Sequence, residues 1–182
     1  MFETIGFLEL NSIAKGIEAA DAMLKAAETE LILAKAGCPG KYYILICGDV
    51  AAVKASLEAG AACAREHVVD STLIPRVHPA VIAAINLAAD VHEVAALGVM
   101  EFFSVSASIR AADAAVKAAD IELIEVRLGT GIGGKSYVAL TGDTAAVTEA
   151  VRCGADTCGD TGLLMDTVVI PNPRPEIFES LL

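Results

Sequence analysis

The sequence has no tryptophan, and aromatic residues make up only 4% of its 182 residues. Hydrophobic residues nevertheless account for 55%, and alanine is abundant among them. Small side chains let helices and strands pack closely, so we expect folded domains, with extensive burial between subunits, rather than disorder. The length fits one domain of ordinary size or two small ones.

Clusters of positive charge are also missing. The chain has 13 Lys and Arg against 24 Asp and Glu, which gives a net charge of -11. Nucleic acids and anionic membranes bind clustered basic residues, so neither is expected as a partner. No apolar run approaches the roughly 18 residues that cross a bilayer. The beginning, MFETIGFLEL, has no charged segment followed by an apolar stretch, so we expect a cytosolic protein.

Cysteine is sparse and irregularly spaced. The five cysteines are an odd number without a repeating framework, which fits a reducing compartment better than a disulfide-rich secreted domain. Four of them, Cys47, Cys63, Cys153 and Cys158, lie in predicted strands or helices and receive no chemical role. Cys38 differs because it lies in a predicted turn.

The chain contains an internal repeat. IGFLELNSIAKGIEAADAMLKAAETELI returns 92 residues later as LGVMEFFSVSASIRAADAAVKAADIELI, and the match continues at shifts of 94 and 96. These shifts pair Lys25 with Lys117, the Gly40-Lys41 step with Gly134-Lys135, and Ile74-Pro75 with Ile170-Pro171. The sequence therefore predicts two similar domains, 1–90 and 91–182, joined by a short spacer around residues 88–93.

Each half is predicted to fold as β-α-β-β-α-β with a short C-terminal helix. In the first half, strands are expected at Glu3–Leu10, Glu30–Lys35, Lys41–Cys47 and His67–Ile74, the last stopped by proline. Apolar positions spaced three and four apart predict the buried faces of the helices. The predicted faces are Ile13, Ile17, Ala20, Leu24 and Ala27, then Val53, Leu57, Ala61 and Ala64, with Val105, Ile109, Ala112, Val116 and Ala119 repeating the first set.

The stretch GTGIGGKS, Gly129–Ser136, fits the pattern G-x-x-x-x-G-K-[ST] of nucleotide-binding loops. Such a loop binds phosphate when its glycines follow a strand and open a helix. Here the next segment, SYVALTGD, is an apolar strand ending in Gly-Asp. We therefore predict a turn between two strands, and a nucleotide-binding enzyme is the least favoured function.

IEAADAMLKAA, its repeat IRAADAAVKAA, the Gly-Lys turn before an apolar strand, and the terminal Ile-Pro step resemble the bacterial microcompartment shell domain. The resemblance covers nearly the whole chain and is to the tandem-domain trimer class. It implies an α/β (α+β) fold of two ferredoxin-like domains, each a four-stranded, antiparallel-containing sheet with flanking helices, without circular permutation. It also implies a pseudo-hexameric homotrimer in the microcompartment shell, a structural tile rather than an enzyme.

In that family the turns between the second and third strands line a central pore. The resemblance thus assigns to the pore Gly37, Pro39, Gly40 and Lys41 from one turn, with Gly131, Ile132, Gly133 and Gly134 from the other. CPGKYY and GIGGKSY are most similar to an iron–sulfur-cluster-bearing shell protein of propanediol-utilisation compartments. That similarity implies one cluster per trimer, of the [4Fe–4S] type, bound by Cys38 of each subunit for electron transfer across the shell.

Symmetry would present three Cys38 thiolates at the axis, enough for three irons, and leave the fourth to water, a small molecule or a partner. Zinc, or a metal-free pore for small metabolites, stays open as an alternative. The resemblance also implies contacts with other shell proteins and a redox partner enzyme in the lumen. The expected tile-edge residues are Lys25, Lys117, Arg76, His78 and Arg174.

Overall fold

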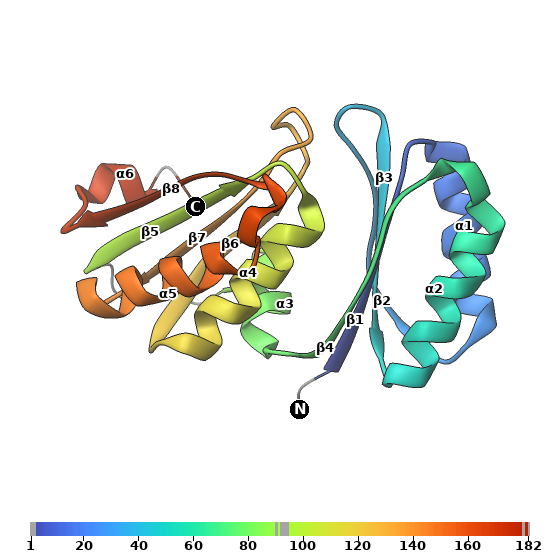
Figure 1. The fold of residues 1–182 in the computed structure, drawn as a ribbon, viewed down its shortest axis with the longest axis horizontal. Helices are drawn as coiled ribbons and strands as arrows, with labels where there is room; N and C mark the ends of the chain where they lie inside the picture. The colour runs from blue at the N-terminus through green and yellow to red at the C-terminus, as the bar shows by residue number, and fades with distance from the viewer. Residues whose placement is uncertain (1–2, 90, 92–94, 180, 182) are drawn as a thin grey trace. The chain divides into compact units, whose positions relative to one another are not determined.

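The computed structural model describes residues 3–89, 91, 95–179 and 181. Residues 90, 92 and 93 of the predicted spacer, residues 88–93, lie outside the described residues, and His92 is one of them. The chain divides into two compact units, Met1–Val77 and His78–Leu182, and each is described by itself below (Figure 1).

The first unit follows the predicted order of strands and helices. Its elements are β1 (Glu3–Leu10), α1 (Ile13–Ala26), β2 (Glu30–Gly37), β3 (Lys41–Gly48), α2 (Val50–Ala64), a short 3₁₀ helix (Arg65–His67) and β4 (Val68–Val77). The strands lie in the order β2-β3-β1-β4, and every neighbouring pair is antiparallel.

The second unit begins with α3 and then repeats the first. Its elements are α3 (Pro79–Ile85), β5 (Ala96–Phe102), α4 (Val105–Ala118), β6 (Ile121–Leu128), β7 (Ser136–Gly142), α5 (Thr144–Asp156), a 3₁₀ helix (Gly159–Thr161), β8 (Leu164–Pro171) and α6 (Pro175–Glu179). The sheet order is β6-β7-β5-β8, again antiparallel throughout. Two four-stranded sheets with flanking helices, in unpermuted order, confirm the predicted fold.

Equivalent residues start and pack the helices of both units. The side chains of Ser12 and Ser104 accept hydrogen bonds from the backbone N–H groups of Lys15 and Ala107, which caps α1 and α4. The paired helices lie side by side over one face of each sheet, α1 with α2 and α4 with α5 (Figure 1). In the first unit, the core between helices and sheet includes Leu8, Leu10, Ala19, Met23, Ile44, Ile46, Val53 and Leu57.

The prediction of which α1 residues are buried is partly wrong. Ile13, Ile17 and Leu24 are exposed by 43%, 57% and 39%, and the buried residues of the helix are Gly16, Ala19, Ala20 and Met23. The cause is close packing, because small residues bring α1 against α2 and the sheet. On α4, the equivalents Val105 and Ile109 are fully buried, as predicted.

Proline does not end β4, contrary to the prediction. The strand continues through Pro75 to Val77, and Glu3 of β1 still pairs with Val77. β4 is at the edge of its sheet, where a residue without an N–H group is tolerated. β8 does end at Pro171.

Helix α3 packs against β6 and α4 of the second unit. The backbone N–H of His78, just before α3, donates a 2.8 Å hydrogen bond to Oδ1 of Asp113 on α4. The division expected at residues 90 and 91 counts this helix with the first domain, whereas the compact units divide between Val77 and His78.

Candidate functional site

The first predicted pore turn, Gly37–Gly40, joins β2 to β3 (Figure 1) and contains Cys38. The Cys38–Pro39 peptide bond is cis, and Gly40 has a φ of 76°, which favours glycine. Cys38 is a free, partly exposed thiol. The turn therefore presents a cysteine between a rigid proline and a glycine.

A tyrosine lies beneath this turn. The hydroxyl of Tyr43 on β3 donates a 3.1 Å hydrogen bond to the carbonyl oxygen of Cys38. The side chain is fully buried, and this burial, helped by the nearby Glu9 carboxylate, raises the pKa of Tyr43 to about 12. The hydroxyl thus stays protonated and able to donate throughout the neutral range.

The second turn, between β6 and β7, is longer and rich in glycine. Gly129, Gly131, Gly133 and Gly134 all have φ between 63° and 82°, and the N–H of Lys135 donates to the carbonyl of Ile132 at 3.3 Å. The segment after Lys135 is β7, which confirms the predicted strand. The glycines therefore join two strands, and no helix N-terminus stands behind them in this part of the described chain.

Each turn is followed by a lysine paired with a glutamate. Lys41 forms an ion pair with Glu9, whose side chain is 4% exposed. Lys135 pairs with Glu101 at 2.5 Å, and both side chains are about one-third exposed. The same pair is thus buried in the first unit and open to water in the second. Glu9 was not predicted as a site residue. It could have been found from the sequence, because both repeats have a glutamate at this position within an otherwise apolar strand.

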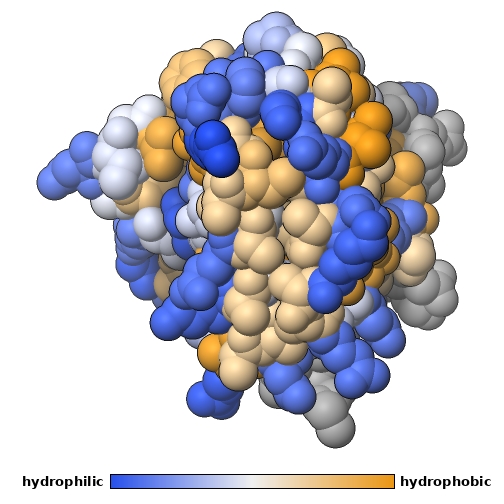
Figure 2. Space-filling view, turned by 90° about the vertical axis from the view of Figure 1, so that its right-hand side faces the viewer, coloured by the Kyte–Doolittle hydropathy of each residue, from blue (hydrophilic) through white to orange (hydrophobic). Residues whose placement is uncertain are grey.

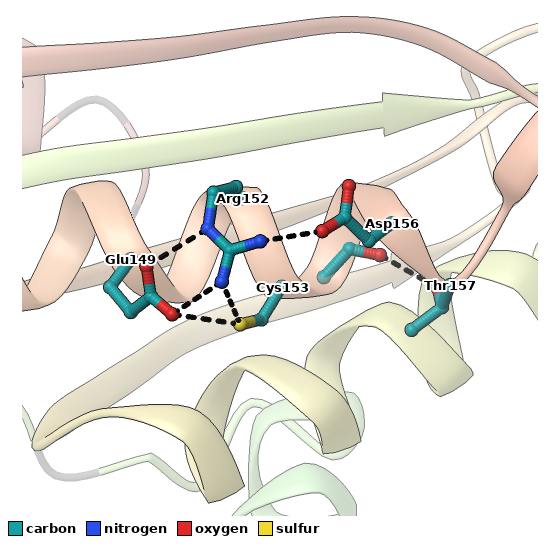
Figure 3. Close-up of polar contacts among 6 residues, drawn as sticks. Glu149, Arg152, Cys153, Asp156 and Thr157 are labelled. Atoms are coloured by element: carbon teal, nitrogen blue, oxygen red, sulfur yellow. Dashed lines mark hydrogen bonds and ion pairs between the residues drawn. The ribbon is translucent and has the colours of Figure 1, made fainter.

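Three of the four remaining cysteines have local explanations. Cys47 and Cys158 are buried, and burial raises the pKa of the Cys158 thiol. On α5, the thiol of Cys153 donates to Glu149 at 3.2 Å and accepts from Arg152 at 3.3 Å (Figure 3). The hydrogen bond to Glu149 raises the pKa of Cys153, and Arg152 in turn holds the pKa of Glu149 at about 2. The raised pKa values of Cys153 and Cys158 favour thiols over thiolate ligands at these two positions.

The residues predicted for the tile edge lie in different settings. Lys25 pairs with Asp21 at 2.5 Å on the exposed face of α1, whereas Lys117 pairs with the largely buried Asp113 at 2.6 Å. His78 caps α3, where its Nδ1 accepts a 3.2 Å hydrogen bond from the N–H of Ala80.

The two arginines predicted for that edge are both exposed. Arg76 has a positive φ of 58° near the end of β4, and Arg174 pairs with Glu176 just before α6 at 3.1 Å. The structure thus gives these five residues local partners or strained backbone, and their contact with a neighbouring tile stays a prediction.

The described residues of a single chain do not form a metal site. Among the described residues, no group of three or more His, Cys, Asp or Glu side chains is arranged to hold a metal ion. In addition, none of the described helices is long and apolar enough to cross a membrane.

The pattern of the BMC domain matches this chain twice, at residues 4–77 and 96–173. The chain belongs to the BMC domain family. It is 42% identical to the bacterial microcompartment shell protein PduT of Citrobacter freundii, over the whole chain and 99% of that protein. A microcompartment protein of Desulfitobacterium hafniense has the same fold, with a TM-score of 0.94, 50% identity and coverage of 98% of this chain and 99% of its own.

Single-domain relatives match part of the chain. The shell protein PduA of Salmonella typhimurium is 41% identical over 78 residues, which cover 42% of this chain and 83% of PduA. The two BMC domains thus explain the sequence repeat, and the full-length matches identify a tandem shell protein.

Proposed function

We propose that this BMC protein forms a homotrimeric shell tile that binds an iron–sulfur cluster through one Cys38 from each subunit. The cluster would transfer electrons across the shell to or from an enzyme in the lumen. The observation that carries the proposal is the partly exposed Cys38 thiol in the β2–β3 turn, in a protein 42% identical to PduT.

The trimer is supported first by the open apolar face of α1, formed by Ile13, Ile17 and Leu24. Figure 2 looks onto the side of the first unit where α1 and α2 lie, and shows a band of apolar surface bordered by hydrophilic residues. The equivalent face on α4 is buried at Val105 and Ile109. Contiguous exposed apolar surface marks contact sites, so we propose that another subunit covers α1.

A second open surface lies on β8 of the other unit, where Met165, Val168 and Ile170 are exposed. The equivalent of Ile170 on β4 is Ile74, which is 7% exposed. At this position the second unit leaves open a residue whose counterpart in the first unit is buried, whereas Val69, the counterpart of Met165, is exposed in the first unit as well. Contact between two unlike surfaces is head-to-tail, and such contacts form a ring when the rotation between neighbouring subunits closes. Three chains with two BMC domains each would give a pseudo-hexagon.

The cluster is supported by the chemistry of the donor. Iron–sulfur clusters are bound by cysteine thiolates, and Cys38 is a free thiol on a turn. Three-fold symmetry converts one thiol into three, which would hold three irons of a [4Fe–4S] cluster. The fourth iron would take water, a small molecule or a side chain of a redox partner. When bound, the cluster would supply one-electron transfer, while the turns would hold it and limit access of solvent.

Metal and sulfide analysis tests this proposal. Protein purified without oxygen should be brown and contain iron and acid-labile sulfide at one cluster per three chains. Cys38→Ser should lose both, while Cys63→Ser, which changes a helix cysteine, should keep both. A wild-type protein that stays colourless after reconstitution with iron and sulfide would rule out the cluster.

A metal-free pore for small metabolites is the second candidate. It is favoured by the glycine-rich turn of the second domain, where a Cβ at Gly131 or Gly133 would meet nothing within 4 Å. Open space around such backbone suits passage of a solute. Retention of transport by Cys38→Ser tiles, together with an absence of iron in the wild type, would support this candidate instead.

A further inference from the structure

The two turns are supported in different ways by equivalent tyrosines, Tyr43 and Tyr137. Tyr43 pairs with Lys35 across the β2–β3 ladder, and Tyr137 pairs with Arg127 across the β6–β7 ladder. Their positions in the two sheets are therefore the same. Their hydroxyl groups nevertheless bind different acceptors, and this difference coincides with the presence of cysteine in only one turn.

Tyr43 connects the body of the first sheet to the turn. Its ring stacks on Phe7 of β1, with centroids 6.1 Å apart and planes inclined by 30°, and both side chains are fully buried. From this fixed position, its hydroxyl donates to the carbonyl oxygen of Cys38. The backbone that carries the thiol is thus tied to the core by one hydrogen bond.

Gly37 makes this arrangement possible. A Cβ built on Gly37 would lie 2.0 Å from Cε2 of Tyr43, well inside the contact distance of two carbons. The ring therefore occupies the space that any other side chain at position 37 would need. Glycine at position 37 therefore allows the Tyr43 ring to pack directly against the backbone of the turn.

Tyr137 is directed elsewhere. Its hydroxyl donates to Oε2 of Glu125 at 2.5 Å, and Glu125 is buried and paired with Arg127 at 2.5 Å. The ladder register places Leu33 of the first unit at the position of Glu125. Leucine offers no acceptor, so Tyr43 is left to bind the turn.

We infer that Tyr43 is a positioning residue for Cys38, which fixes the turn so that three thiols can meet at one centre. This inference rests on the proposed cluster, because the orientation of the thiol matters only if Cys38 is a ligand. The second turn, whose tyrosine binds Glu125, keeps the freedom of its glycines and holds no ligand.

Hydrogen exchange and metal content of Tyr43→Phe test the inference together. Phenylalanine keeps the ring and its stacking on Phe7 but removes the hydroxyl. Loss of one hydrogen bond should speed amide exchange in the segment 37–41 roughly fivefold. Iron bound per trimer should fall, and the electron paramagnetic resonance signal of the reduced cluster should broaden or shift.

Tyr137→Phe is the matched control, since it removes the equivalent hydroxyl from the other domain. It should leave exchange in 37–41 and the cluster signal unchanged. Leu33→Glu is a second variant, which gives the first unit the equivalent of Glu125. Because Lys35 lies opposite Tyr43 as Arg127 lies opposite Tyr137, the Tyr43 hydroxyl should then donate to the new carboxylate instead of to Cys38. This variant should loosen the turn as Tyr43→Phe does, with the tyrosine still present.

Unchanged exchange in both Tyr43→Phe and Leu33→Glu would overturn the inference. Faster exchange with an unchanged cluster signal would also overturn it, because the Tyr43 hydrogen bond would then stabilise the turn without affecting how Cys38 binds the cluster. A wild-type protein without iron would contradict the proposed cluster instead, and exchange alone would then decide whether Tyr43 holds the turn.

Discussion

At the scale of single residues, the same ion pair has two environments. Lys41–Glu9 is largely buried, whereas Lys135–Glu101 is open to water. Removing one partner of a buried pair leaves an uncompensated charge and costs roughly 3 kcal/mol, but an exposed pair contributes less than about 1 kcal/mol. Lys41→Met should therefore lower the free energy of unfolding much more than Lys135→Met, as measured by urea denaturation at equal protein concentration. Equal losses would contradict the difference in burial.

Cys153 gives a prediction for pH dependence. Its hydrogen bond to Glu149 raises the pKa of the thiol, and the thiolate is the form that reacts. The raised pKa keeps the thiolate fraction low at neutral pH, so alkylation by iodoacetamide should rise at higher pH than for an ordinary cysteine. Glu149→Gln removes this stabilisation of the thiol and should shift the profile to lower pH.

Peptide mass spectrometry across pH 7–10 would measure this reaction, with Cys63 as the internal reference in the same samples. The pH profile of Cys63 alkylation should be unaffected by Glu149→Gln. A Cys153 profile that does not move in the variant would show that Glu149 does not control the thiol.

At the scale of helices and strands, glycines set how closely the paired helices approach. A Cβ at Gly60 of α2 would lie 2.5 Å from Cγ of Met23 on α1. Gly60→Ala should gain about 1 kcal/mol of helix propensity but lose roughly 1–3 kcal/mol to overpacking, so thermal stability should fall. Ala55→Gly, at an exposed position of the same helix, measures the propensity term by itself. A more stable Gly60→Ala protein would contradict the tight contact.

The exposed face of α1 predicts an effect on assembly. Ile17 is 57% exposed, so Ile17→Glu should leave the single chain folded but place a charge in the proposed interface. The variant should sediment as a monomer with an unchanged circular dichroism spectrum. Glu58→Lys, a charge reversal on the exposed surface of α2, should remain a trimer; a trimeric Ile17→Glu protein would move the interface away from α1.

Much of this architecture could be predicted from the sequence, because the repeat and the alternation of apolar residues specify strands and helices directly. The apolar strand that follows Lys135 also indicated a turn between two strands rather than a phosphate loop. The buried face of α1 could not be predicted, since small residues such as Ala19 and Gly16 pack closely while Ile17 stays open. The role of Tyr43 could not be predicted either. The acceptor of its hydroxyl depends on the residue two positions before Lys35, which is Leu33 here, whereas the equivalent residue in the second unit is Glu125.

At the scale of the whole molecule, the two BMC domains share a fold and differ in the turn between their second and third strands. The first has the cysteine turn, a tyrosine that holds it, and a buried ion pair beside it. The second has a glycine-rich turn and a tyrosine bound to Glu125. Duplication within one chain lets a trimer have six similar domains but only three thiols at its centre, which is the number that the proposed cluster requires.

Native mass spectrometry of the anaerobically purified protein tests this central claim most directly, because it reports assembly and cofactor in one measurement. We expect a particle of three chains that carries the additional mass of one [4Fe–4S] cluster, and a Cys38→Ser particle of three chains without it. A monomer, or a wild-type trimer with the bare mass of three chains after reconstitution, would contradict the account.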